Sequence, residues 1–259
     1  MAEMELVTHL MTPSAFVLAL SVAFIAGVVK GMVGFAMPMI LISGLSSVIS
    51  PELALAGLIL PTVITNGMQA MRQGPRAAWE SLLKFRGYLG TLLIVLIISA
   101  QLVRTIPAEL MLLIIGVPIV IFAATQLAGM PLRIASPPSR FAEIGIGAFA
   151  GFIGGLSGVW GPPTVAYLTA LDTPKRDHIR VQGVIYGLGA IVLLFAHIGS
   201  GVVRAETLPF SIAIVPPAIV GMWLGLKVND RIDQNAFRKA TLFVLMIAGL
   251  NLIRRGVIG

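Results

Sequence analysis

The sequence predicts an all-α membrane protein that crosses the bilayer several times. Hydrophobic residues make up 57% of the 259 residues, and charged residues make up only 11%. The mean hydropathy is +0.97. Apolar runs of the roughly 20 residues that a spanning helix needs recur along the whole chain. We therefore expect a single transmembrane domain over residues 1–259, with no separate soluble domain.

Residue types that are rare or missing narrow the chemistry of the chain. There is no cysteine, which excludes disulfides, thiol catalysis and Cys-ligated metals. The three histidines, His9, His178 and His197, are far apart in sequence and give a histidine-rich metal centre little support. The sequence has no H-E-x-x-H motif, no Walker A motif and no plausible Ser-His-Asp set. We expect a protein that is not an enzyme, needs no cofactor and is not driven by ATP.

The net charge of +7 has a different meaning in a membrane protein than in a soluble one. In a soluble protein such an excess would suggest nucleic acid as a partner. In a membrane protein, Lys and Arg gather in the loops that face the cytoplasm. Nucleic acid is therefore not expected as a partner, and the charge is used below to predict the orientation of the segments.

Proline, glycine and polar residues divide the chain into eight apolar segments. Their boundaries are 15–49, 52–71, 82–103, 108–128, 141–171, 180–198, 207–228 and 236–253. The first and fifth segments are long and share the pattern G-x-x-x-G-x-x-G, which is followed by proline. The glycines are Gly27, Gly31 and Gly34 in the first segment and Gly154, Gly158 and Gly161 in the fifth. The prolines are Pro38 in the first segment and Pro162 and Pro163 in the fifth.

The two matching segments each open a group of four, which predicts an internal duplication. The first repeat covers 15–128 and the second covers 141–253. The closing segments, PAELMLLIIGVPIVIFAATQL and QNAFRKATLFVLMIAGLNLI, occupy the same place in their repeats.

Loop charges predict that the two repeats are inverted relative to each other. The loop after the second segment holds Arg72, Arg76, Lys84 and Arg86, whereas its counterpart after the sixth holds only Arg204. The loops after the fifth and seventh segments are basic. Their counterparts are the loop after the first segment, which holds no basic residue, and the loop after the third, which holds one. Because each repeat has an even number of segments, inversion requires its first segment to enter and leave on one side as a re-entrant hairpin. Full spanning by the first and fifth segments stays open.

The broken first and fifth segments are the predicted substrate site. Proline interrupts each helix and leaves half-helices, whose free N–H groups and positive dipole end can hold an anion. Paired breaks at corresponding places in two repeats indicate a transporter site near the midplane. The residues assigned to it from the breaks are Gly31, Gly34, Pro38, Gly158, Gly161 and Pro162. The alternative is that these glycines only allow close helix packing.

Lys30 is the only ionisable residue between Glu5 and Glu52. A cation at bilayer depth costs about 2.5 to 3.5 kcal/mol on insertion scales, so we interpret it as the counter-charge of an anionic substrate. Snorkelling to the membrane surface is the alternative. The equivalent position in the second repeat is Ser157, and Trp160 is a candidate apolar wall, although Trp residues often only pack or anchor a helix at the interface.

Polar residues on the second segment of each repeat are further candidates. Asn66, Gln69 and Gln73 recur at spacings of three and four, and therefore lie on one helix face. Gln182 lies near the start of the sixth segment. Asn66, Gln69 and Gln182 either complete hydrogen bonds to substrate oxygens or join helices. A charged loop at 172–180 is expected to be solvated.

The segments FIAGVVKGMVGFAMPMILI and FAGFIGGLSGVWGPPTVAYL, with the closing FRKATLFVLMIAGLNLI, resemble the TauE/SafE sulfite exporter family. The resemblance implies a multi-pass secondary transporter, or permease, of the bacterial cytoplasmic (inner) membrane. It implies as substrate a small anion such as sulfite, an organosulfonate or a related sulfur-containing or carboxylated organic anion. An anion channel, or a non-transport intramembrane enzyme or assembly factor, is the alternative. The direction of transport, coupling to H⁺ or Na⁺ and a homodimeric assembly stay open.

Overall fold

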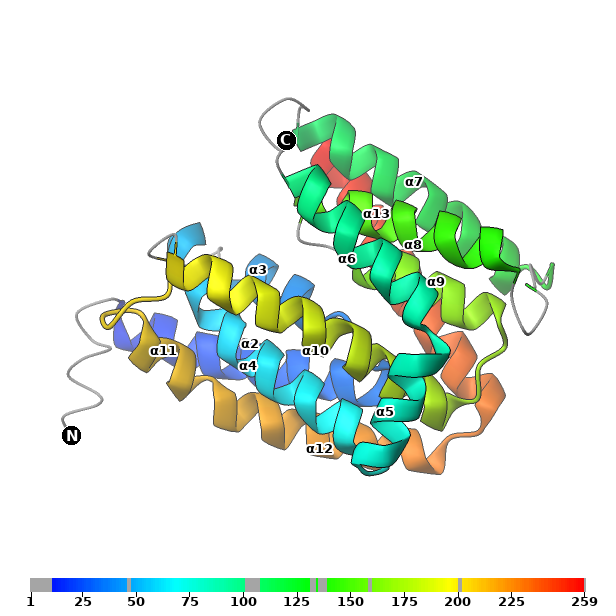
Figure 1. The fold of residues 1–259 in the computed structure, drawn as a ribbon. Coiled ribbons are helices and arrows are strands. Elements are labelled where there is room, and N and C mark those ends of the chain that lie inside the picture. The colour runs from blue at the N-terminus through cyan, green and yellow to red at the C-terminus, as the bar shows by residue number, and fades with distance from the viewer. Residues whose placement is uncertain are drawn as a thin grey trace. The chain divides into compact units, whose positions relative to one another are not determined.

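The computed structural model describes residues 11–45, 48–100, 108–130, 134, 139–157, 160–199 and 202–258. These residues form helices and no strand (Figure 1). In chain order the helices are α2 (Pro13–Val33), α3 (Met37–Leu45), α4 (Pro51–Met71), α5 (Pro75–Lys84), α6 (Arg86–Ala100), α7 (Ala108–Leu127), α8 (Arg140–Ser157), α9 (Gly161–Ala170), α10 (Lys175–Gly199), α11 (Leu208–Ala213), α12 (Val215–Arg231) and α13 (Gln234–Ile258).

Several of these helices are long and apolar enough to cross a membrane. Five pass on length and composition: Pro13–Val33, Leu53–Met71, Lys175–Phe195, Leu208–Arg231 and Gln234–Ile258. A sixth is obtained if α5 and α6, which meet at an angle of 74°, count as one broken span. The predicted all-α membrane fold is therefore confirmed. The first and fifth segments are each interrupted, as α2 with α3 and as α8 with α9.

The chain folds into two compact units, and each contains segments from both ends of the sequence. The first unit consists of 1–75 and 182–232, and the second consists of 76–181 and 233–259. Helix α10 begins in the second unit and continues into the first.

In the first unit, α2 and α12 run side by side in the same direction (Figure 1). A Cβ atom on Gly27 would lie 2.2 Å from the carbonyl oxygen of Ala218, and one on Gly31 would lie 2.2 Å from that of Met222. Gly221 and Gly225 of α12 face α2 in the same way. Glycine is needed at these positions because the two backbones touch directly.

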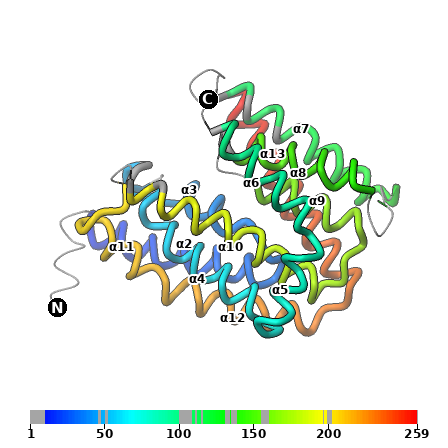
Figure 2. The backbone as a smooth tube through the Cα atoms, viewed as in Figure 1, coloured from blue at the N-terminus to red at the C-terminus, as the bar shows by residue number. Residues whose placement is uncertain are grey.

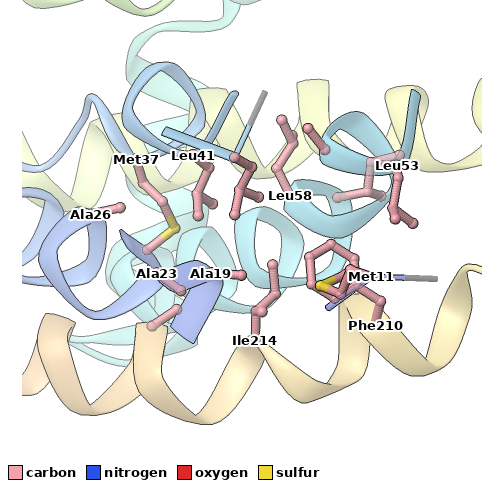
Figure 3. Close-up of a cluster of buried hydrophobic side chains, with 14 of the residues drawn as sticks. Met11, Ala19, Ala23, Ala26, Met37, Leu41, Leu53, Leu58, Phe210 and Ile214 are labelled. Atoms are coloured by element: carbon pink, nitrogen blue, oxygen red, sulfur yellow. The ribbon is translucent and has the colours of Figure 1, made fainter. Parts of the chain in front are cut away.

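Helix α3 folds back along α2, so the first segment forms a helical hairpin. A Cβ atom on Gly44 of α3 would lie 2.6 Å from a Val22 methyl carbon of α2. In the buried cluster that joins these helices to α4, Ala26 and Met37 lie at one end, and Met11 and Leu53 lie at the other (Figure 3). The start of α2 and the start of α4 therefore lie at the same end of the first unit.

Helix α4 contains an internal proline whose effect is repaired by a neighbouring helix. Pro61 has no N–H group with which to bond the carbonyl of Gly57, one turn earlier. The hydroxyl of Ser211, on α11, donates to that carbonyl at 3.0 Å and accepts from the N–H of Leu60 at 3.3 Å. A neighbouring side chain that satisfies the freed group makes proline tolerable in an apolar helix.

The second unit repeats this kind of packing with other helices. Helices α6 and α8 lie side by side, and so do α7 and α13 (Figure 2). A Cβ atom on Gly151 of α8 would lie 2.3 Å from the carbonyl oxygen of Leu92 on α6. Tyr88 of α6, which contacts Gly147 of α8, also hydrogen-bonds Thr164 of α9 at 2.8 Å. Helix α9 therefore returns along the α6–α8 pair.

Candidate functional site

The break in the first segment is a tight left-handed turn. Helix α2 ends at Val33, and Gly34 follows with φ 90°, a conformation that glycine adopts without strain. The N–H of Gly34 closes the helix by bonding the carbonyl of Lys30 at 2.7 Å. Ala36 also has a positive φ, 74°, which is uncommon for a residue with a Cβ atom. Helix α3 then starts at Met37, with Pro38 in its first turn.

Lys30 lies in the last turn of α2 and is buried, with 1% of its surface exposed. Its ammonium donates a hydrogen bond to Oδ1 of Asn66 on α4. Among the described residues, no carboxylate forms an ion pair with it. The negative end of the α2 dipole favours a cation at this position. A side chain that is buried and bonded to an amide does not match the snorkelling alternative.

Side-chain amides satisfy the carbonyl groups that the break leaves without helical partners. Gln69 of α4 donates from Nε2 to the carbonyl of Gly34 at 3.1 Å, and Lys30 O lies 3.5 Å from the same nitrogen. Asn229 of α12 donates from Nδ2 to the carbonyl of Met32 at 2.9 Å. Helix ends away from water need such partners. Helices α4 and α12 therefore hold the turn in place.

The break lies near one end of the first unit and not halfway along its helices. Gln69 and Asn229 lie in the last turns of α4 and α12. Just beyond them, Arg72 and Asp230 form an ion pair at 2.6 Å. Helix α2 runs for 21 residues, about 31 Å, before it breaks, and a position of the site near the membrane midplane stays a prediction. That length is already enough to cross a hydrocarbon core of about 30 Å.

The structure gives the glycines and proline of the first break different roles. Gly31 packs against Met222, which agrees with the alternative that these glycines only allow close helix packing. Because Gly31 lies inside α2, its N–H group is not one of the free groups at a helix start. Gly34 forms the turn itself. Pro38 lies in the first turn of α3, whose leading N–H groups point away from the rest of that helix.

Gln182 lies on α10, at the point where this helix enters the first unit, and it is fully buried. Neither Nε2 nor Oε1 of its amide has a hydrogen-bond partner among the described residues. Its neighbour Gly183 packs on α4, where a Cβ atom would lie 2.6 Å from Cβ of Gln69. Oε1 of Gln69 is likewise buried without a described partner. Polar groups that are buried and unpaired in this way are available to a ligand.

The residues predicted at the second break belong to the second unit. Ser157 ends α8, Gly161 starts α9 and Pro162 is buried in the first turn of α9. Trp160 is buried against α8, where a Cβ atom on Gly154 would lie 3.0 Å from Cβ of Trp160. Gly158 lies outside the described residues. Because the two breaks lie in different compact units, their meeting at one site stays a prediction from the sequence.

Two residues at the first break were not found by sequence reasoning. Asn229 was overlooked because it lies between Lys227 and Arg231, beside Asp230, in a charged stretch where a solvated position is the simple expectation. Thr65 lies four residues before Gln69 on α4, and its hydroxyl bonds Pro61 O at 2.5 Å and lies 3.5 Å from Sδ of Met37. The i, i+4 spacing to Gln69 was the signal that could have identified Thr65. Among the described residues, no group of His, Asp and Glu could hold a metal ion.

Comparison with known proteins assigns the chain to a family. The family model described as Sulfite exporter TauE/SafE matches residues 19–252, nearly the full chain. No curated protein and no solved structure matches significantly. The match includes the helices of both units and both interrupted segments. The chain is therefore a multi-pass membrane protein that belongs to the TauE/SafE sulfite exporter family.

Proposed function

We propose that the chain is a secondary transporter of small anions that works by alternating access and uses Lys30 as the counter-charge of its substrate. The substrate class is sulfite, an organosulfonate or a related sulfur-containing or carboxylated organic anion. Membership of a family of membrane sulfite exporters supports the class of function. The bacterial cytoplasmic membrane is the proposed location.

The single observation that carries the proposal is the buried ammonium of Lys30. A buried cation is costly, and its usual compensation is a nearby carboxylate. Lys30 has a neutral amide, Asn66, as its hydrogen-bond partner and no ion pair within the described part of the chain. An anion that binds beside it supplies the missing charge. In the empty protein, the amide and the α2 dipole offset part of the cost.

The surrounding polar groups fit an oxyanion. The ammonium has three N–H donors, of which Asn66 uses one, and the amide of Gln182 adds two further donors. The first N–H groups of α3 lie just after the turn and carry the positive end of its dipole. Sulfite, sulfonate and carboxylate groups each present two or three acceptor oxygens, which can accept from several N–H donors of this kind.

Flux into proteoliposomes tests the proposal. The purified chain is reconstituted, and uptake of sulfite, a sulfonate and a carboxylate is followed under separately imposed pH, Na⁺ and voltage gradients. A transporter gives saturable uptake that responds to at least one gradient or exchanges with internal anion. Uptake that rises linearly with concentration at all accessible values would indicate a channel, and no uptake of any anion would contradict the proposal.

A further inference from the structure

A small polar pocket lies in the second unit, where the end of α9, the start of α10 and the start of α13 meet. The residues that line it are Thr169, Asp172, Thr173, His178, Gln234, Phe237 and Arg238. It shares no residue with the Lys30 site. The pocket has room for about one occupant of the size of a water molecule.

The pocket is held open by the turn between α9 and α10. Asp172 adopts φ 51°, which turns the chain sharply after α9 and lets the N–H of Thr173 bond Leu168 O at 3.2 Å. The side-chain amide of Gln234, at the start of α13, then bridges this turn to α10. It donates to Thr173 O at 3.2 Å and accepts from the N–H of Lys175 at 2.8 Å. The three elements are therefore fixed to one another by hydrogen bonds.

Two polar side chains in the pocket wall are buried without a partner. His178 is 2% exposed and Thr169 is 6% exposed. Nε2 of His178 and Oγ1 of Thr169 have no hydrogen-bond partner in the described part of the chain. A buried polar group that stays unpaired costs about 1 to 3 kcal/mol. Two such groups that line the same pocket indicate that an occupant bonds to both.

The charges around the pocket favour an anion. The guanidinium of Arg238 lines it, and Nη2 of Arg238 donates to Oε1 of Gln126 at 2.5 Å. Nη1 lies 3.8 Å from Oδ1 of Asp172, beyond direct hydrogen-bond distance. The segments 172–180 and 233–239 hold five basic residues against three acidic ones. The hydroxyl of Thr169, the imidazole N–H of His178 and the guanidinium of Arg238 can each donate to an anion. The carboxylate of Asp172, which also lines the pocket, is the acceptor that opposes an anion there.

We propose that this pocket binds a single halide ion, chloride under ordinary salt conditions. The hydroxyl of Thr169, the N–H of His178 and the guanidinium of Arg238 donate to it, and the ring of Phe237, 5.3 Å from that of His178, forms an apolar wall. A chloride ion is a single atom somewhat larger than a water molecule, whereas sulfite and sulfonates are much larger and do not fit the pocket. The ion fixes the α9–α10 turn to α13, and this role does not depend on the proposed transport function.

Thermal unfolding of the purified full chain in detergent tests the halide site. Sodium chloride replaces sodium gluconate stepwise at constant ionic strength, and sodium bromide and sodium sulfate are run in parallel. Because a ligand that binds only the folded state stabilises it, chloride and bromide should raise the unfolding midpoint along a saturating curve. Sulfate should give only a general salt effect.

Thr169→Val and Thr241→Val form a matched pair of variants. Both replace a buried hydroxyl that lacks a described partner with a methyl group of the same shape, but only Thr169 lines the pocket. Thr169→Val should fold, because it removes an unpaired group, and should lose the saturating shift with chloride. Thr241→Val should keep the shift.

Two results would overturn the halide site. The first is a parent chain with no saturating halide response, in which case a water molecule fills the pocket. The second is a Thr169→Val variant that responds to chloride as the parent does. If Thr169→Val does not fold, the chlorine NMR line width decides the question: broadening by the parent should be lost in His178→Phe, and broadening that persists there contradicts the site.

Discussion

Lys30 is the residue on which the proposed transport site depends. The sequence identified it because it stands alone among ionisable residues in a long apolar segment. It could not identify the partner, because a lysine side chain is long enough to reach several helices or the membrane surface. The structure assigns Asn66 as that partner and leaves the charge without a carboxylate among the described residues.

Lys30→Met should weaken anion binding by at least tenfold, which is about 1.4 kcal/mol, because it removes the counter-charge and keeps a side chain of similar length. The fold should survive, since the change removes a buried charge that has no ion pair to lose. Affinity is measured on purified protein, with the unfolding midpoint as a check on folding. Lys84→Met is the control, because Lys84 is exposed on α5. Unchanged affinity in folded Lys30→Met would make Lys30 structural.

Asn229→Leu should lower stability by about 1 to 3 kcal/mol, because it removes the donor to Met32 O at the buried end of α2. The matched control is Asn251→Leu on α13, where the amide oxygen accepts from the exposed Arg254 at 3.0 Å. Unfolding midpoints in one detergent compare the two. Equal losses in the two variants would show that Asn229 is not needed to hold the break.

At the scale of elements, the sequence predicted most of the helices closely. The segments 52–71 and 108–128 correspond to α4 (Pro51–Met71) and α7 (Ala108–Leu127). The bend at Phe85, which separates α5 from α6, was missed. No proline lies near it, and the glycines of the run SLLKFRGYLG, Gly87 and Gly90, lie inside α6 and not at the bend. The spacing of the glycines in the first segment could not separate packing from anion binding. The structure shows that Gly31 packs directly on α12, and a part for it in the substrate site stays a prediction.

Gly31→Ala and Gly221→Ala should strongly destabilise the α2–α12 pair. The new Cβ atoms would lie 2.2 Å from Met222 O and 2.1 Å from Phe24 O, so the two helices must move apart. Gly67→Ala on α4 is the control in the same unit, because no atom lies within 4 Å of its Cβ position. Since alanine favours a helix over glycine by about 1 kcal/mol, Gly67→Ala should be neutral or stabilising. Similar unfolding midpoints for all three variants would contradict direct backbone contact.

At the scale of the whole molecule, the opening segment of each predicted repeat pairs with the third segment of a repeat, and this pairing supports the proposed duplication. Helix α2, from the first segment, pairs with α12 from the seventh, and α8, from the fifth, pairs with α6 from the third. Both pairs run parallel and use glycine contacts. The sequence could not predict which helices pair, because periodicity identifies the face that a helix buries but not the helix that covers it.

The last prediction concerns the side on which the first segment enters and leaves the membrane. Because α3 folds back along α2, Ser14 and Val48 should lie on one side of the membrane, and Asp230, at the opposite end of the first unit, should lie on the other. The chain contains no cysteine, so single cysteines at these three positions can be labelled without background. A membrane-impermeant thiol reagent added to sealed vesicles should label Ser14→Cys and Val48→Cys from the same side, and Asp230→Cys only from the other. Each variant must first show normal expression and a normal unfolding midpoint. Labelling of Ser14→Cys and Val48→Cys from opposite sides would mean that the first segment spans the membrane, and the inverted arrangement of the repeats would then fail, because each repeat would contain an even number of full spans.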